Sequence, residues 1–353
     1  MKPGMRFAFA AAALVSLTAA VTGMLIYASH PGSNFYLIGW DELEHRSFAE
    51  MLLHGGSGSL AENAQAGQAL TGSANWGTGL VIALCRYLFG SELAFIVLKW
   101  ALHVLAGWLL YGLLKRYRGE TIAAYVTLFF LLYPPLLLYG ASFLKDDLVA
   151  ALVVIAAAAV DRRRFLAAAA LLLLMIAIRA NAVMFPIILI GYLRRARLRY
   201  VLLAAAIPFV AVAMVLPESI KSMADIVLLS PGTVAFFAAK YLLGPLPTNL
   251  FSYDTESAWL FPWYTLSFLG ILVGLLLPGF YSSLRANWVW ILLLLAACLA
   301  PYLPYVKELD IIGPRQFATV GWLYFLLFYE RVLRYEFRLE PRRAAEDTWS
   351  PAT

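Results

Sequence analysis

The chain has 353 residues, of which 62% are hydrophobic and only 14% are charged. Its length would fit about two or three soluble domains, but apolar stretches of membrane-spanning length recur along it and exclude an ordinary soluble enzyme. The formal net charge of +6 comes from basic clusters beside these stretches, which indicates membrane orientation and not nucleic-acid binding. We therefore expect an all-α polytopic membrane protein.

The N-terminal segment begins with Lys2 and Arg6 and continues into an apolar run of about twenty residues. A signal peptide has a shorter apolar core of about 7–15 residues, so we interpret this run as an uncleaved anchor helix over about 8–28. Cleavage near the "IYAS" stretch is the alternative. The basic residues before this span place the N-terminus in the cytoplasm.

Two long polar segments are predicted on the outer face. The first, about 29–91, carries the charged stretch "WDELEHRSFAEML" and ends in an apolar part, 77–89, that includes Arg86. This part is too short to span a bilayer comfortably, so we expect an interfacial or re-entrant helix. The second segment, about 217–258, contains "SPGTVAFFAAKYLLG", which also predicts an interfacial helix.

Arginine clusters separate the remaining apolar stretches, and all of them fall on one predicted side, which supports the sidedness. The sequence thus predicts about ten transmembrane helices in one domain, 1–335, followed by a basic and then polar cytoplasmic tail, 336–353. We expect a bacterial-type inner membrane, both termini in the cytoplasm, and "SSLRANW" as a cytoplasmic turn. The predicted spans are about 8–28, 92–114, 121–141 (broken at Pro134–Pro135), 147–160, 165–178, 182–193, 200–216, 259–281, 288–305 and 315–330.

The ionisable residues that do not mark topology gather on the predicted outer face. In a helix over "DELEHRSFAEML", Asp41 and His45 are side by side, as are Glu42 and Arg46, because each pair is four residues apart. A solvated face of an interfacial helix would explain these charges. However, Asp41 directly follows Trp40 at the membrane edge, where a desolvated carboxylate can serve as a general base.

Two further outer turns carry charges for which a structural role stays open. Asp146 and Asp147 follow Lys145 at the start of a helix, where carboxylates can simply cap the positive end of the helix dipole. Arg179 lies in a tight turn between two apolar stretches, where its side chain can extend to lipid headgroups. Later outer segments add the cations Lys240, Lys307 and Arg315.

Several motifs occur in an order and on a side that resemble a known superfamily. "WDELEHRSFAEML" resembles the first outer loop of the type C glycosyltransferases (GT-C superfamily), which include protein O-mannosyltransferases and lipid A aminoarabinose transferases. "YPPLLLYGASFLKDDLVAALVVIAAAAVDRRR" and "IAIRANAVMFP" are similar to a proline-containing helix with its Lys-Asp turn, and to a later arginine turn, in bacterial members and polysaccharide-assembly proteins. "GPRQFATVGWLYF" is a weaker likeness to an arginine-led last helix. The resemblance covers most of the first 200 residues or so.

The resemblance implies an inverting glycosyltransferase of cell-envelope polysaccharide biosynthesis. It would transfer a sugar from a polyprenyl-phosphate-linked donor to a lipid, glycan or protein acceptor on the outer (periplasmic or extracellular) face of the membrane. Asp41 would be the catalytic base. Acceptor contact or orientation would fall to Glu42, His45, Asp146 and Asp147. Fixed cations assist departure of a phosphate, and the candidates are Arg179, Arg315, Lys145, Lys240 and Lys307.

Other functions stay open at this stage. The motifs require no cofactor, but a divalent metal between Asp41, His45 and a later carboxylate is an alternative. A polysaccharide polymerase or ligase would use the same lipid-linked pathway, although 217–258 lacks the arginines typical of its late outer loop. A lipid or glycan transporter would require ionisable residues within the spans, where only His103 lies deep and Lys99 lies nearer the outer end.

Overall fold

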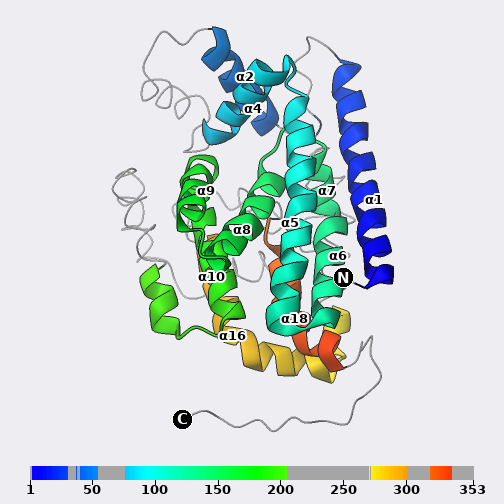
Figure 1. Cartoon of the computed structure of the whole chain (residues 1–353), viewed down its shortest axis with the longest axis vertical. Helices are drawn as coiled ribbons and strands as arrows, with labels where there is room; N and C mark the ends of the chain where they lie inside the picture. The colour runs from blue at the N-terminus through cyan, green and yellow to red at the C-terminus, as the bar shows by residue number, and fades with distance from the viewer. Residues whose placement is uncertain are drawn as a thin grey trace.

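The computed structural model describes residues 2–30, 37, 40–54, 76–204, 270, 272–299 and 319–335. Every regular element within these residues is helical, which confirms the all-α class. The helices are α1 (Pro3–Ala28), α2 (Trp40–His54), α4 (Trp76–Phe89), α5 (Ala94–Arg118), α6 (Glu120–Leu132), α7 (Pro134–Gly140), α8 (Asp146–Asp161), α9 (Phe165–Ile178), the 3-10 helix η1 (Ala180–Val183), α10 (Met184–Leu193), α16 (Pro278–Leu299) and α18 (Gly321–Tyr335). Most of them form one bundle, and α2 and α4 lie at one end of it (Figure 1).

Helix α8 forms the centre of this bundle. Its sequence, "DDLVAALVVIAAAAVD", is apolar on all sides between the two leading acids and Asp161, and nearly all of its residues are buried. It packs against α5, α7, α9 and α10. Small alanine side chains let these helices approach closely. The two acids at the start of α8 are therefore enclosed by other helices.

Three of the described helices are long and apolar enough to cross a membrane: α1, α5 and α16. The bent pair α6 and α7 would make a fourth. Large apolar side chains, such as Phe7, Trp108 and Leu292, are exposed on these long helices, as expected for a surface in contact with lipid. These features fit an all-α membrane protein.

The described residues do not support the predicted count of about ten spans. Helices α8, α9 and α10 have 16, 14 and 10 residues, fewer than the roughly 20 that a bilayer requires. The prediction treated each apolar run between charges as a span, whereas α8 is a buried core helix. The predicted segment 217–258, the tail 336–353, most of 200–216 and about half of the predicted span 259–281 lie outside the described residues.

Several predicted helix boundaries are confirmed. Helix α9 covers the predicted range 165–178, and α4 forms the short helix expected at 77–89. Pro134 and Pro135 separate α6 from α7 with a bend of 45°, because proline lacks a backbone N–H but suits the first turn of a helix. Local sequence signals therefore sufficed to predict the break between α6 and α7, because that break depends on the backbone chemistry of proline.

The predicted turn at "SSLRANW" is wrong, because α16 passes through it without interruption. Ser283 and Asn287 are one helical turn apart, and both are buried against α18. The Ser283 hydroxyl accepts a hydrogen bond from the Arg331 N–H (2.9 Å), and Asn287 Nδ2 donates to the Leu327 carbonyl (2.8 Å). These polar residues connect two helices and do not form a turn.

Charged groups concentrate at the two ends of the bundle. At the end opposite α2, Arg116 and Arg194 pair with Asp161 at the end of α8, and Arg118 pairs with Glu330 of α18 (3.6 Å). Hydrogen bonding with Asp161 raises the pKa of the Arg194 guanidinium. Helix α2 and the start of α8 lie at the other end, so these arginines are separated from the acidic stretch that opens α2.

The connection between α7 and α8, residues 141–145, is packed tightly against α1. A Cβ atom on Gly23 would collide with the carbonyl oxygen of Ala141. The absence of a side chain at Gly23 therefore allows the backbone of α1 to contact this connection directly. The connection leads into the first turn of α8, where the predicted site residues Asp146 and Asp147 lie.

Candidate functional site

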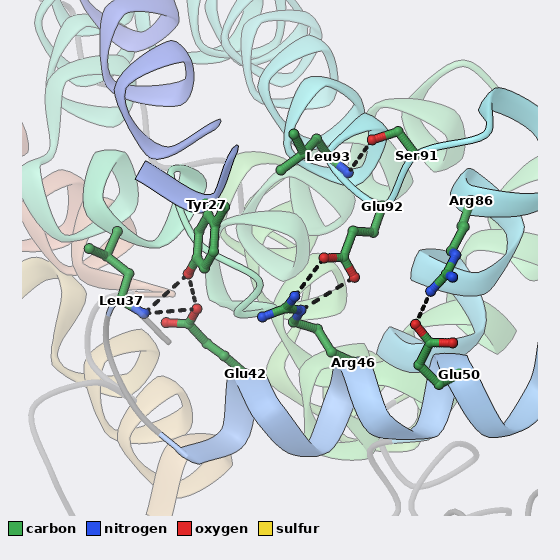
Figure 2. Close-up of polar contacts among 9 residues, drawn as sticks. All are labelled: Tyr27, Leu37, Glu42, Arg46, Glu50, Arg86, Ser91, Glu92 and Leu93. Carbon is green, nitrogen blue, oxygen red and sulfur yellow. Dashed lines mark hydrogen bonds and ion pairs between the residues drawn. The ribbon is translucent and has the colours of Figure 1, made fainter. Parts of the chain in front are cut away.

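One stripe of α2 anchors the helix to three other parts of the structure (Figure 2). Glu42, Arg46 and Glu50 recur every four residues and so lie on one side of the helix. The contacts are the Tyr27 hydroxyl of α1 to Glu42, Arg46 to Glu92 before α5, and Arg86 of α4 to Glu50. Glu42 is therefore one of the residues that anchor α2. The sequence spacing indicated only that Glu42 and Arg46 are neighbours on the same helix, and it did not predict these contacts with other helices.

Arg46 also connects α2 with the segment that precedes α8. Its Nη2 lies 2.7 Å from Glu92 Oε1, and its guanidinium lies 5.1 Å from the ring of Phe143 in the α7–α8 connection. The Phe143 ring meets the Tyr27 ring edge-on at 4.7 Å. Cation–π and aromatic contacts of this kind add to the ion pair. They hold α2 against the connection.

A second stripe of α2 starts at Asp41 and continues through His45, Phe48 and Leu52, at spacings of four, three and four residues. His45 and Phe48 are buried, and Asp41 and Leu52 are partly exposed. Because residues with this spacing share one face, Asp41 lies on the face that packs toward the other helices. Asp41 and Glu42 are adjacent acids, but Glu42 is buried and Asp41 is accessible to solvent.

Lys99 and Asp147 form a buried ion pair between α5 and α8. Their side chains are 0% and 1% exposed, and Nζ lies 3.0 Å from Asp147 Oδ1. The same ammonium group donates to the carbonyl oxygens of Tyr139 (2.6 Å) and Leu144 (2.9 Å). An ammonium group has three donors, so these three acceptors match its full capacity.

Asp146, the preceding residue, makes a different ion pair. Arg179 Nη2 lies 2.8 Å from Asp146 Oδ1, and Nη1 donates to the Thr319 hydroxyl (3.0 Å). That hydroxyl in turn donates to Asp146 Oδ1 (3.3 Å). Asp146 is buried, and the Arg179 side chain is 11% exposed. Arg179 therefore turns into the bundle, whereas contact with lipid headgroups would require it to turn outward.

The acids at the start of α8 make ion pairs with other elements, in addition to any capping of the helix. Lys145, the N-cap residue, makes no side-chain capping hydrogen bond, and it is buried. Asp146 and Asp147 each pair with a cation from another element, so they are more than helix caps. Successive helical residues point about 100° apart, which lets them face α9–η1 and α5 respectively.

The charges at this end act on one another. Glu42, Asp146 and Asp147 all lie within electrostatic range of Lys99, so α2 and the start of α8 belong to one site. Asp41, which directly precedes Glu42 in α2, is partly exposed at the same end of the bundle. We refer to the following residues as the α2-end cluster: Asp41, Glu42, Lys99, Asp146, Asp147, Arg179 and Thr319.

Sequence reasoning missed two members of this cluster. Lys99 lies in an apolar helix, and an ionisable residue there requires a partner, so a partner was foreseeable although its identity was not. Thr319 gave no signal of its own. Of the five cations predicted to hold a donor phosphate, Arg179 and Lys145 lie at this end, whereas Lys240, Lys307 and Arg315 are outside the described residues.

A divalent metal between Asp41, His45 and a later carboxylate is an alternative that the sequence leaves open. Within the described part of the chain, no group of three or more His, Cys, Asp or Glu residues is arranged to hold a metal ion. Asp41, His45 and a later carboxylate therefore do not form such a group within these residues. Instead, Asp146 and Asp147 bind protein cations, as shown above.

Comparisons with known proteins complete the description of the site. No protein-family model matches the chain, and neither a curated protein nor a solved structure matches it. The resemblance to the type C glycosyltransferases therefore stays a prediction from motifs.

Proposed function

We propose that this chain is an inverting glycosyltransferase of the membrane, which takes a sugar from a polyprenyl-phosphate-linked donor at the α2 end. The observation that carries the proposal is the α2-end cluster itself. It combines the partly exposed Asp41, which directly precedes Glu42 in α2, with buried cations and acids at the same end of the bundle. Ionisable groups are costly in such surroundings and mark functional sites. A substrate with a lipid tail and a charged head suits this arrangement.

In this proposal Asp41 is the general base. Its carboxylate accepts the proton of an acceptor hydroxyl, and the hydroxyl oxygen attacks the anomeric carbon of the donor. The bond from that carbon to the phosphate oxygen breaks, and polyprenyl phosphate leaves with the electron pair. Attack from the opposite side inverts the configuration. The second stripe of α2 supports this role, because it directs Asp41 toward the bundle and keeps it accessible to solvent.

Arg179 is the first candidate to hold the donor phosphate. Its guanidinium offers five N–H donors in a planar fork that suits phosphate oxygens, and Asp146 and Thr319 fix its orientation. Arg315 is the second candidate, because it precedes Thr319 by only four residues. Lys145, Lys240 and Lys307 are the remaining candidates.

The proposed function requires one orientation of the bundle in the membrane. The α2 end would face the periplasm or the exterior, and the arginine-rich end would face the cytoplasm of a bacterial-type inner membrane. The grouping of Arg116, Arg118 and Arg194 at the end opposite α2 supports this orientation. The acceptor would then be a lipid, a glycan or a protein on the outer face.

A transporter is the second function that a specific observation favours. Transport would use ionisable groups inside the spans, and the buried pair of Lys99 and Asp147 is such a feature. Against it, the three acceptors around Lys99 match its full donor capacity. Lys99 also lies only five residues, or about 7.5 Å, from the start of α5. The pair is therefore near an end of the bundle, away from its middle.

The proposal is tested with the full chain reconstituted in phospholipid vesicles. The probes are polyprenyl-phosphate-linked hexoses and pentoses that carry a radiolabel in the sugar, with bacterial membrane lipids and glycans as acceptors. We expect label in an acceptor fraction and release of polyprenyl phosphate. Arg179→Lys keeps a charge for Asp146 but loses the fork, so the donor KM should rise about tenfold. Glu50→Gln, on the anchor stripe of α2, is the matched control and should leave the KM unchanged.

Two other results would replace the proposal. Movement of intact donor across the vesicle, with no cleavage of the sugar–phosphate bond, would identify a transporter. Consumption of lipid-linked oligosaccharides but not of single-sugar donors would identify a polymerase or ligase.

A further inference from the structure

Lys99 holds the α7–α8 connection at both ends. It donates to the carbonyl oxygen of Tyr139 in the last turn of α7, to that of Leu144 just before α8, and to the carboxylate of Asp147 in the first turn of α8. Helix α1 contacts the same connection, because the backbone at Gly23 lies directly against Ala141. Contacts from both α5 and α1 therefore hold the connection in place.

This fixed connection sets the position of the next carboxylate. Asp146 is covalently adjacent to Asp147 and belongs to the same first turn of α8. Its carboxylate orients the Arg179 guanidinium at 2.8 Å, and Thr319 closes the group with hydrogen bonds to both. A change in the first turn of α8 would therefore be passed to Arg179 through Asp146.

A direct role of Lys99 in phosphate binding is disfavoured by its surroundings. Its side chain is 0% exposed, and its three donors are matched by three acceptors of the protein. Binding a phosphate would require it to release at least one of them. Its influence on a substrate has to be indirect.

We propose that Lys99 is a positioning residue, which sets the donor-binding guanidinium of Arg179 through the α7–α8 connection and Asp146. The consequence for donor binding rests on the proposed function, whereas the mechanical link from Lys99 to Arg179 does not.

The mechanical link is tested without any ligand by hydrogen–deuterium exchange on the full chain in vesicles. The variant is Lys99→Met/Asp147→Leu, which removes both charges and leaves no buried charge unpaired. We expect exchange at 179–183, where the Ala182 N–H bonds to the Arg179 carbonyl (2.9 Å), to become about tenfold faster or more. Helix α16 is the internal control and should not change. Faster exchange confined to 139–149 would overturn the proposal.

Donor binding is tested with polyprenyl phosphate alone, titrated into vesicles that hold the wild-type chain or the double variant. We expect an about tenfold higher Kd for the variant. Equal Kd values would overturn the positioning role. If the wild-type chain binds no polyprenyl phosphate while exchange at 179–183 still responds, the proposed function fails and the mechanical link stands.

Discussion

The two ends of the bundle both contain ion pairs, but they expose them differently. At the α2 end, Lys99 and Asp147 are 0% and 1% exposed, so both charges are withdrawn from solvent. At the other end, Asp161 is 2% exposed while its partner Arg116 is 60% exposed. The start of α8 therefore holds buried, mutually neutralised pairs, whereas its other end presents exposed arginines around the buried carboxylate of Asp161.

This difference indicates different roles. Exposed pairs are screened by water and salt and contribute little to stability, but arginines in that position suit lipid headgroups and a cytoplasmic surface. Buried pairs hold their partners in one geometry, because an unpaired charge there is strongly unfavourable. In the proposed function, the buried pairs at the α2 end would hold ligand-binding groups at fixed positions. The exposed arginines at the other end would help to hold the bundle in the membrane.

The largest expected effect on stability follows from breaking the buried pair. Asp147→Ala leaves the Lys99 ammonium buried without its carboxylate, which should cost about 3–5 kcal/mol of unfolding free energy. Unfolding of the purified chain in mixed detergent–SDS micelles measures this loss. The variant Lys99→Met/Asp147→Leu, with neither charge, should recover most of the stability. An Asp147→Ala protein as stable as the wild type would contradict the buried character of this end.

An intermediate effect is expected from the contact between α1 and the α7–α8 connection. Gly23→Ala places a Cβ against the backbone oxygen of Ala141, and overpacking of this kind should cost about 1–3 kcal/mol. Gly112→Ala in α5 is the matched control, because a Cβ there meets no atom within 4 Å. The control should be neutral or stabilising by up to about 1 kcal/mol. Equal stability of the two variants in the same unfolding assay would argue against the close contact.

The smallest effect is expected at the arginine-rich end. Arg116→Gln removes an exposed partner of Asp161, while Arg194 still pairs with that carboxylate (3.0 Å). The cost should stay within about 0–1 kcal/mol, and added salt should reduce it further. A loss comparable to that of Asp147→Ala would remove the contrast between the two ends.

The sequence predicted local features of this site better than its long-range contacts. Helical spacing correctly placed Asp41 beside His45, because neighbours four residues apart share a face in any helix. It could not show that Lys99 pairs with Asp147, 48 residues away, or that Arg179 contacts Thr319, 140 residues away. Such partners depend on how helices pack, and single-sequence patterns do not contain that information.

The same limit explains the errors in the fold. An apolar run of moderate length predicts either a span or a buried core helix, and α8 proved to be a core helix. In "SSLRANW", polar residues favoured a turn, but Ser283 and Asn287 lie one turn apart and bind α18. The proline break at Pro134–Pro135 and the ends of α9 were predictable, because they depend on local backbone chemistry.

Asp41 is the proposed base for sugar transfer at the α2 end, and the variant Asp41→Asn tests this role most directly. The amide nearly preserves the shape of the side chain but cannot accept the proton. We expect turnover of the polyprenyl-phosphate-linked donor to fall about 10²–10⁴-fold, with unchanged binding of polyprenyl phosphate. Glu44→Gln on the same helix is the control and should keep wild-type turnover. A correctly folded Asp41→Asn protein with wild-type turnover would contradict the claim.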